Sequence, residues 1–129
     1  MKFRTRKMVM ARDLNAAGTL FGGRALEWLD EEAAIFAYCQ LGQPKHLVTK
    51  FISAVDFHAP AKLGDVVEIG LRTVAVGTTS ITVEAVLRNK VTHEEIVRLD
   101  KMVFVHLTDG HPSPHGKTME TITQDEDQD

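Results

Sequence analysis

The sequence predicts an α+β domain in which one long helix packs against an antiparallel sheet of about five strands. One observation is the order of the segments, because a strand-like segment is followed by a helix-like segment and then by four more strand-like segments. Another is their composition, since short segments rich in Val, Ile, Thr and Phe are typical of strands. The chain has 129 residues and a net charge of −3, which fits one domain.

Each element has its own signal. The first strand is expected at residues 3–10, and a helix of good helix formers at about 24–41, with Gly42 and Pro44 just beyond its end. Four further strands are expected at about 46–57, 65–76, 79–89 and 95–107. The clearest strand alternation predicts an inward-facing set made of Ile81, Val83, Ala85 and Leu87. Gly77-Thr78 predicts a tight hairpin turn.

The two ends of the chain carry opposite charge. The first twelve residues hold five bases and no acid, and the last ten hold five acids and no base. We expect a folded domain at 1–110 and a disordered polar, acidic tail at 111–129. The basic start is not followed by an apolar stretch, so it is not a signal peptide, and no run of about 20 apolar residues spans a membrane. We therefore expect a cytoplasmic protein without membrane insertion, and the single Cys39 excludes an internal disulfide.

Asp30 is the strongest anomaly in the helix. At 100° per residue it falls on the same narrow stripe as Leu26, Ala33 and Ala37, which should face the sheet. A carboxylate on an apolar face costs several kcal/mol unless it is paired or hydrogen-bonded. Such a carboxylate is a candidate general base or nucleophile. A carboxylate at the rim that makes a cap or an ion pair is the alternative, and periodicity does not decide between them.

The other side of the helix is also apolar. Trp28, Ile35 and Tyr38 lie away from the Asp30 stripe. A helix that is apolar on two sides usually packs against a second protein surface. We therefore expect an oligomer.

Several short motifs occur in a specific order. They are Asn15-Ala-Ala-Gly18, Phe21-Gly22-Gly23, a helix acid (Asp30) seven residues after Gly23, Val48-Thr49, Phe57-His-Ala-Pro60, Gly64-Asp65-Val66-Val67 and Val76-Gly77-Thr-Thr-Ser80. In this order and spacing, over about residues 3–107, the chain resembles the hotdog-fold acyl-CoA thioesterases, in the branch of the YciA-like and brain-type acyl-CoA hydrolases.

The resemblance implies a hotdog fold, in which the sheet wraps around the central helix. It also implies a homodimer with a continuous sheet, often assembled as a trimer of dimers. The active sites would lie between subunits, with the Asn15 loop of one chain facing Asp30 of its neighbour. The reaction implied is hydrolysis of an acyl-CoA thioester to a carboxylic acid and CoA.

The resemblance also assigns roles. Asp30 would be the general base that activates water, or a nucleophile, and Asn15 would hold the water or the substrate carbonyl. Gly22 and Gly23 precede the helix, where unpaired N–H groups point outward, so the Gly23 N–H is the candidate oxyanion donor. The alternative is structural, with a tight loop at the glycines and a turn or cap at Asn15.

Further residues are candidates for substrate binding. Thr49 and Ser80 match family positions beside the thioester and pantetheine, although each could be an ordinary strand hydroxyl. Arg72, Arg88 and Lys90 are candidates for the CoA phosphates, although each could belong to a solvated strand face. CoA enters only as part of the substrate, and no other cofactor and no metal is expected. His111 and His115 have metal-like spacing only in a helix, which Pro112 and Pro114 prevent.

Two other functions remain open. One is a hotdog 3-hydroxyacyl-thioester dehydratase or hydratase, in which His58 would act with Asp30 or Glu31. The other is a non-catalytic acyl-CoA-binding module, which would not need Asp30. Nucleic-acid binding is not expected from an acidic chain without a fitting motif, and Cys39 is expected to be inert.

Overall fold

The computed structural model describes residues 1–122, so the last part of the predicted tail, residues 123–129, lies outside the described residues. The helical elements are a 3₁₀ turn, η1 (Ala11–Asp13), one long helix, α1 (Gly22–Gln40), and a helical turn at residues 119–122. The strands are β1 (Lys2–Met8), β2 (Leu47–Ile52), β3 (Val55–Phe57), β4 (Val66–Val76), β5 (Ser80–Asn89), β6 (Glu95–Thr108) and β7 (His111–Pro112). The predicted α+β class is confirmed.

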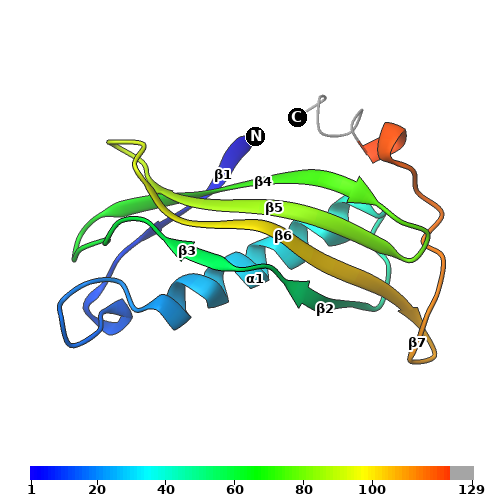
Figure 1. The fold of residues 1–129 in the computed structure, drawn as a ribbon, viewed down its shortest axis with the longest axis horizontal. Helices are drawn as coiled ribbons and strands as arrows, with labels where there is room; N and C mark the ends of the chain where they lie inside the picture. The colour runs from blue at the N-terminus through cyan, green and yellow to red at the C-terminus, as the bar shows by residue number, and fades with distance from the viewer. Residues whose placement is uncertain (123–129) are drawn as a thin grey trace.

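The strands form one antiparallel sheet that curls around α1 (Figure 1). The order across the sheet is β1-β4-β5-β6-β2, and β3 continues the β2 edge by pairing with β6. The short connections at 77–79 and 90–94 are closed by backbone hydrogen bonds, from Gly77 to Ser80 (3.0 Å) and from Asn89 to Glu94 (2.9 Å). The sheet therefore has two edges, β1 and the line of β2 and β3.

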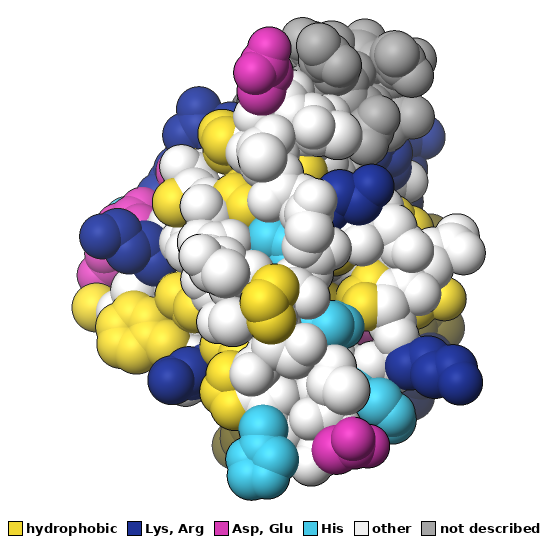
Figure 2. Space-filling model, turned by 90° about the vertical axis from the view of Figure 1, so that its right-hand side faces the viewer, with side chains coloured by type: hydrophobic (Ala, Val, Ile, Leu, Met, Phe, Trp, Pro, Cys, Tyr) yellow, Lys and Arg dark blue, Asp and Glu magenta, His cyan; other side chains and the backbone are white. Residues whose placement is uncertain are grey.

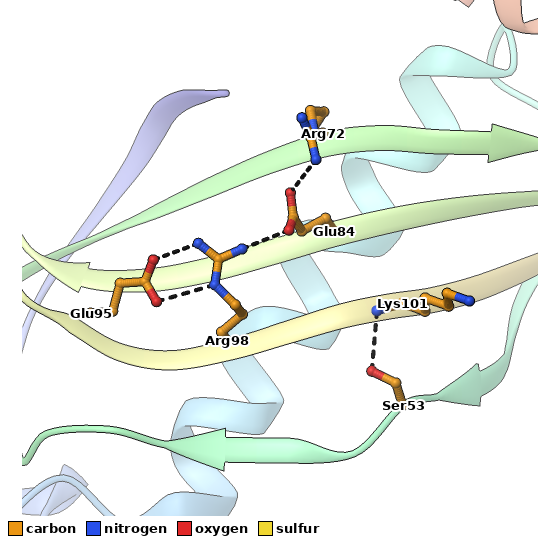
Figure 3. Close-up of polar contacts among 6 residues, drawn as sticks. All are labelled: Ser53, Arg72, Glu84, Glu95, Arg98 and Lys101. Carbon is orange, nitrogen blue, oxygen red and sulfur yellow. Dashed lines mark hydrogen bonds and ion pairs between the residues drawn. The ribbon is translucent and has the colours of Figure 1, made fainter.

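The strand predicted at 46–57 is two strands, because Ser53 interrupts it. The Ser53 N–H donates to the Lys101 carbonyl (2.9 Å), and the Lys101 N–H donates to Ser53 Oγ (3.1 Å) instead of to a backbone carbonyl (Figure 3). The Ser53 hydroxyl thus replaces a backbone carbonyl as the acceptor at one position of the β-ladder. The two pieces pair with β6 on either side of this point.

The core lies between α1 and the inner face of the sheet. The four residues predicted to face inward on β5, Ile81, Val83, Ala85 and Leu87, are all completely buried. Small side chains on α1, among them Ala25, Ala33 and Ala37, are buried against the sheet. Small residues let the helix approach closely, so the inner face can curl around it.

The outer face of the sheet carries a row of ion pairs. Arg98 contacts Glu95 and also Glu84, whose other oxygen lies 2.9 Å from Arg72 Nη2 (Figure 3). The hydrogen bond from Arg98, aided by the charges of Arg98 and His58, holds the pKa of Glu95 below its ordinary value despite partial burial. The hydrogen bond to Glu95 likewise raises the pKa of Arg98.

Residues 111–122 follow the end of β6 and make specific contacts. Ser113 donates its N–H to the His106 carbonyl (2.9 Å), and Ile122 is completely buried in the core cluster. His115 Nε2 lies 2.9 Å from the Ser80 carbonyl, and His115 Nδ1 accepts the Lys117 N–H (3.0 Å). The division of the chain at residue 110 stays a prediction.

The end of the molecule near these residues is rich in histidine (Figure 2). His46 and His106 line a hollow of about 680 Å³ there, together with Asp109. Nevertheless, residues 1–122 contain no group of three or more His, Cys, Asp or Glu side chains placed to hold a metal ion. Within the same residues, no helix has the length and apolar character needed to cross a membrane.

Replacing Glu95 tests the outer ion pairs. Because folding lowers the pKa of Glu95, its carboxylate stabilises the fold above its ordinary pKa of 4.5, and this contribution is lost as the pH falls through the lowered value. We expect Glu95→Gln to reduce the free energy of unfolding at pH 7 by about 0.5 kcal/mol, as is usual for exposed pairs. In urea unfolding, this difference should shrink as the pH falls below 4.5. The exposed neighbour variant Glu94→Gln keeps the Glu95–Arg98 pair and should leave the free energy of unfolding at pH 7 close to that of the wild type. Equal destabilisation by the two variants at pH 7 would contradict the assignment.

Candidate active site

Asp30 lies on the flank of α1 that faces β2. Its Oδ1 accepts a hydrogen bond from Thr49 Oγ1 on β2, at 2.8 Å. The buried positions of α1 include Leu29, Ala33 and Phe36, and their centre lies about 90° around the helix from Asp30. Ala33 and Ala37 of the predicted stripe are buried, but Asp30 lies at the edge of the buried face, as the rim alternative expected, and not at its centre. The carboxylate is half-buried at the rim, where it is both held and accessible.

The burial of Trp28 moves the buried face of α1 away from Asp30. It was expected to face a second subunit, but it is only 9% exposed within its own chain. Lys7 of β1 lies 5.6 Å from the centre of the Trp28 ring. The curl of β1 over the helix thus covers a side that periodicity alone marks as free. Ile35 and Tyr38 do remain exposed, at 50% and 41%.

Asn15 organises the loop before α1. Its Oδ1 accepts the N–H groups of Ala17 (2.9 Å) and Thr19 (3.1 Å), and its Nδ2 donates to Thr19 Oγ1 (3.1 Å). This is the turn role that the sequence left open as the alternative. An amide nitrogen carries two hydrogens, so this loop uses one and leaves a second for another acceptor.

Gly22 and Gly23 form the first turn of α1. Within residues 1–122, their N–H groups have no hydrogen-bond acceptor, as is usual at a helix start. A Cβ at Gly22 would lie 3.1 Å from Phe57 Cζ, and one at Gly23 would lie 2.9 Å from Phe21 Cε1. Asn15 and Gly22 line one hollow of about 390 Å³ together with Phe57 and His58. The Asn15 amide, the start of α1 and β3 therefore meet at this hollow.

Two half-sites result, and one chain does not bring them together. Asp30 and Thr49 form the first, and Asn15 with the two glycines forms the second. Asp30 lies seven residues beyond Gly23, about 10.5 Å along the helix axis. This is too far for the Gly23 N–H and the Asp30 carboxylate to act on atoms of the same carbonyl and water, which lie about 3 Å apart.

The remaining predicted residues lie elsewhere. Ser80 and Val48 both pair with Val105, so Ser80 is two strand spacings, about 9.5 Å, from the β2 edge. Arg72 and Arg88 are on the outer face, opposite α1, and contact Glu84 and Glu68 respectively. Lys90 follows β5 and donates its N–H to the Val66 carbonyl (2.9 Å). Within one chain, none of these four residues joins either half-site.

His58 and Phe57 extend the second half-site. His58 lies with Asn15 and Gly22, whereas Asp30 is held by Thr49 on the other half-site. The pairing of His58 with Asp30 that a dehydratase would need is therefore not formed within one chain. Phe57 belongs to the Phe57–Pro60 motif but was not predicted to be part of the site. Its signal is Gly22, where the lack of a side chain leaves room for the Phe57 ring.

A family model described as the thioesterase superfamily matches residues 17–96, which include Asp30, Thr49 and the two glycines and begin two residues after Asn15. The chain belongs to the thioesterase superfamily. This match runs from the Asn15 loop to the start of β6 and so covers α1 and the strands around it.

Relatives narrow the branch. The acyl-CoA thioester hydrolase YciA of Salmonella typhimurium is 33% identical over 116 residues, which cover 84% of this chain and 86% of the relative. An uncharacterised acyl-CoA thioester hydrolase of Zymomonas mobilis is 31% identical over 93 residues, which cover 69% of this chain. The match spans only 58% of the Zymomonas relative's length.

Solved structures agree with this placement. A hexameric hotdog-fold thioesterase of Campylobacter jejuni has a TM-score of 0.75 at 27% identity, covering 96% of this chain and 95% of that chain. An acyl-CoA hydrolase of Staphylococcus aureus, in complex with butyryl-CoA and CoA, has a TM-score of 0.77 at 31% identity, covering 85% and 68%. The predictions of the hotdog fold and of an acyl-CoA thioesterase are confirmed.

Two variants separate the structural role of Asn15 from its donor role. Asn15→Ala removes the acceptor of two loop N–H groups and should lower the free energy of unfolding by about 1–2 kcal/mol. Asn15→Asp keeps this acceptor and loses only the Nδ2 donor, so it should stay close to the wild type. Chemical denaturation measures both changes. Equal destabilisation by the two variants would show that the Nδ2 donor, rather than the Oδ1 acceptor, holds the loop.

Proposed function

We propose that this thioesterase hydrolyses acyl-CoA to a carboxylic acid and free CoA at a site that a second copy of the chain completes. The observation that carries this proposal is the separation of the two half-sites. Asp30 and Thr49 hold a carboxylate for water, while Asn15, Gly22 and Gly23 present N–H donors for a carbonyl. Each set lacks what the other supplies.

The proposed reaction begins with water beside Asp30. The carboxylate takes a proton from the water as its oxygen attacks the thioester carbonyl carbon. The oxygen of the tetrahedral intermediate accepts the Gly23 N–H, at the positive end of the α1 dipole, with the second Nδ2 hydrogen of Asn15 beside it. The C–S bond then breaks, and the departing thiolate of CoA receives the proton from Asp30. Acyl-CoA and water thus give the acid and CoA.

Thr49 acts as a positioning residue in this scheme. Its hydroxyl occupies one oxygen of the Asp30 carboxylate at 2.8 Å, so the other oxygen is directed to the water. A carboxylate fixed in this way loses little rotational freedom when the reaction begins. Direct attack by the Asp30 carboxylate on the thioester is the alternative for the same geometry.

The edges of the sheet favour a dimer through β2. Val48, Phe51 and Ile52 on this edge are 39–52% exposed, and Phe57 on the adjoining β3 is 54% exposed. The β1 edge instead carries four bases, Lys2, Arg4, Arg6 and Lys7, which are typical of an edge protected from pairing. We propose that β2 pairs with β2 of a second copy to form a continuous sheet. A trimer of such dimers is proposed by analogy with the hexameric neighbours.

Substrate contacts extend from the two half-sites. Thr49 and Ser80 are proposed to border the thioester and pantetheine, and Arg72, Arg88 and Lys90 are proposed to serve CoA phosphates from a neighbouring copy. The complex of the Staphylococcus aureus relative with butyryl-CoA supports acyl-CoA as substrate class. No cofactor is proposed beyond CoA itself, and the protein is proposed to work in the cytoplasm.

Asp30→Ala tests the general base. An acyl-CoA hydrolase of Staphylococcus aureus was itself solved as an aspartate-to-alanine variant, at 30% identity to this chain. We expect thiol release from butyryl-CoA, followed with a chromogenic thiol reagent, to fall at least about 100-fold. The control Glu27→Ala, on an exposed turn of the same helix, should retain its rate. Undiminished thiol release by Asp30→Ala, or removal of the double bond of crotonyl-CoA without thiol release, would overturn the proposed reaction.

Mixing two inactive variants tests the shared site. Asn15→Asp and Asp30→Ala each damage a different half-site, so a mixed dimer contains one site with both halves intact. After dissociation and reassociation, we expect thiol release to reach roughly a quarter of the wild-type rate, because half of the dimers are mixed and each has one intact site of two. Verified mixed dimers without recovered activity would place both half-sites in one chain.

A further inference from the structure

Phe57 places a large apolar ring beside the proposed oxyanion donors. It is the last residue of β3 and is 54% exposed. The tip of its ring faces the first turn of α1, where Cζ lies 3.1 Å and Cε1 lies 3.3 Å from the position of a Cβ on Gly22. The ring therefore takes the space that a side chain at Gly22 would need, one residue from the Gly23 N–H.

The hollow beside Phe57 suits a small uncharged group. Its volume of about 390 Å³ lies near the lower end of the range of small-molecule sites, about 300–1,000 Å³. Leu20, Ala59 and Pro60 add apolar surface, and His58 is the single titratable side chain among the described residues that line it. The CoA phosphates, which need positive charge, therefore have no lysine or arginine partner in this lining.

The proposed reaction brings the acyl group to this hollow. The thioester oxygen accepts the Gly23 N–H, and the carbonyl carbon behind it carries two substituents. One is the sulfur, which leads into CoA, and the hollow is too small to hold CoA. The other is C2 of the acyl chain, which is only two bonds from the oxygen and so lies close to Gly22. Because the Phe57 ring fills the side of Gly22, C2 meets this ring before any later carbon does.

We propose, on the basis of that reaction, that Phe57 is a specificity-determining residue that contacts C2 of the acyl chain and excludes acyl groups branched at this carbon. A straight chain presents only hydrogens at C2 and lies against the ring. A methyl branch at C2 needs the space that the ring already takes. An apolar pocket discriminates one such carbon by about 10–200-fold, so the effect is large enough to measure.

Two isomeric substrates test this contact. Butyryl-CoA and isobutyryl-CoA have the same atoms and differ only in the branch at C2. We expect the wild type to show at least about tenfold higher kcat/KM for butyryl-CoA, and Phe57→Leu and Phe57→Ala to bring the ratio toward 1. Loss of stability or of a subunit contact would lower both rates alike and leave the ratio unchanged. A wild type without this preference, or an unchanged ratio in both variants, would overturn the proposal.

Phe21 provides a matched control. It is 55% exposed and its ring also lies against a glycine, Gly23, but it does not line the hollow. Phe21→Leu should therefore keep the wild-type preference for butyryl-CoA. Relaxation of the preference by Phe21→Leu to the same extent as by Phe57→Leu would refute the assignment to Phe57.

Binding measurements separate this contact from the reaction. S-butyl-CoA and S-isobutyl-CoA carry a thioether in place of the thioester, so the enzyme cannot hydrolyse them. By titration calorimetry, the wild type should bind S-butyl-CoA more tightly, and Phe57→Leu should bind the two about equally. Equal affinities in the wild type would show that the acyl contact is wrong even if thiol release proceeds. Discrimination between the thioethers without thiol release from butyryl-CoA would instead uphold the contact and refute the reaction.

Discussion

The close packing of α1 against the inner face of the sheet is the constraint on which the rest of the structure depends. Ala25, Ala33 and Ala37 have only a methyl side chain, so the helix axis lies near the strands. The sheet curls around the helix as a result. Curling places β2 along one flank of the helix and β1 along the other. The first flank gives Asp30 its Thr49 partner, and the second places Lys7 over Trp28.

The same curl leaves the sheet with two edges of different chemical character. A sheet that curls around a helix still has two edges, and these edges differ in charge and polarity. The basic β1 edge repels another copy of itself, whereas the apolar β2 edge loses exposed surface if it is paired. Because the Asp30 half-site lies beside that apolar edge, the proposed pairing of β2 with a second copy would also assemble the proposed complete site.

Much of the fold was predictable from the sequence, because strand and helix periodicities are local. The helix began two residues earlier and ended one residue earlier than predicted, and the inward residues of β5 were identified correctly. The break at Ser53 was not predictable, since it depends on Lys101 across the sheet. The burial of Trp28 by Lys7 required the curl of β1. For the site, the resemblance suggested both Asp30 and Thr49, but periodicity had no means of joining residues 19 positions apart.

The contacts of His115 have a consequence for the end of the chain. Because Nδ1 accepts the Lys117 N–H, the ring hydrogen must sit on Nε2, where it is donated to the Ser80 carbonyl. One ring therefore has two jobs, because Nδ1 holds the backbone of the segment after β6 and Nε2 holds the β4–β5 hairpin at Ser80. The end of the chain and the hairpin are thus joined through a single side chain, and a substitution at His115 would release both contacts together.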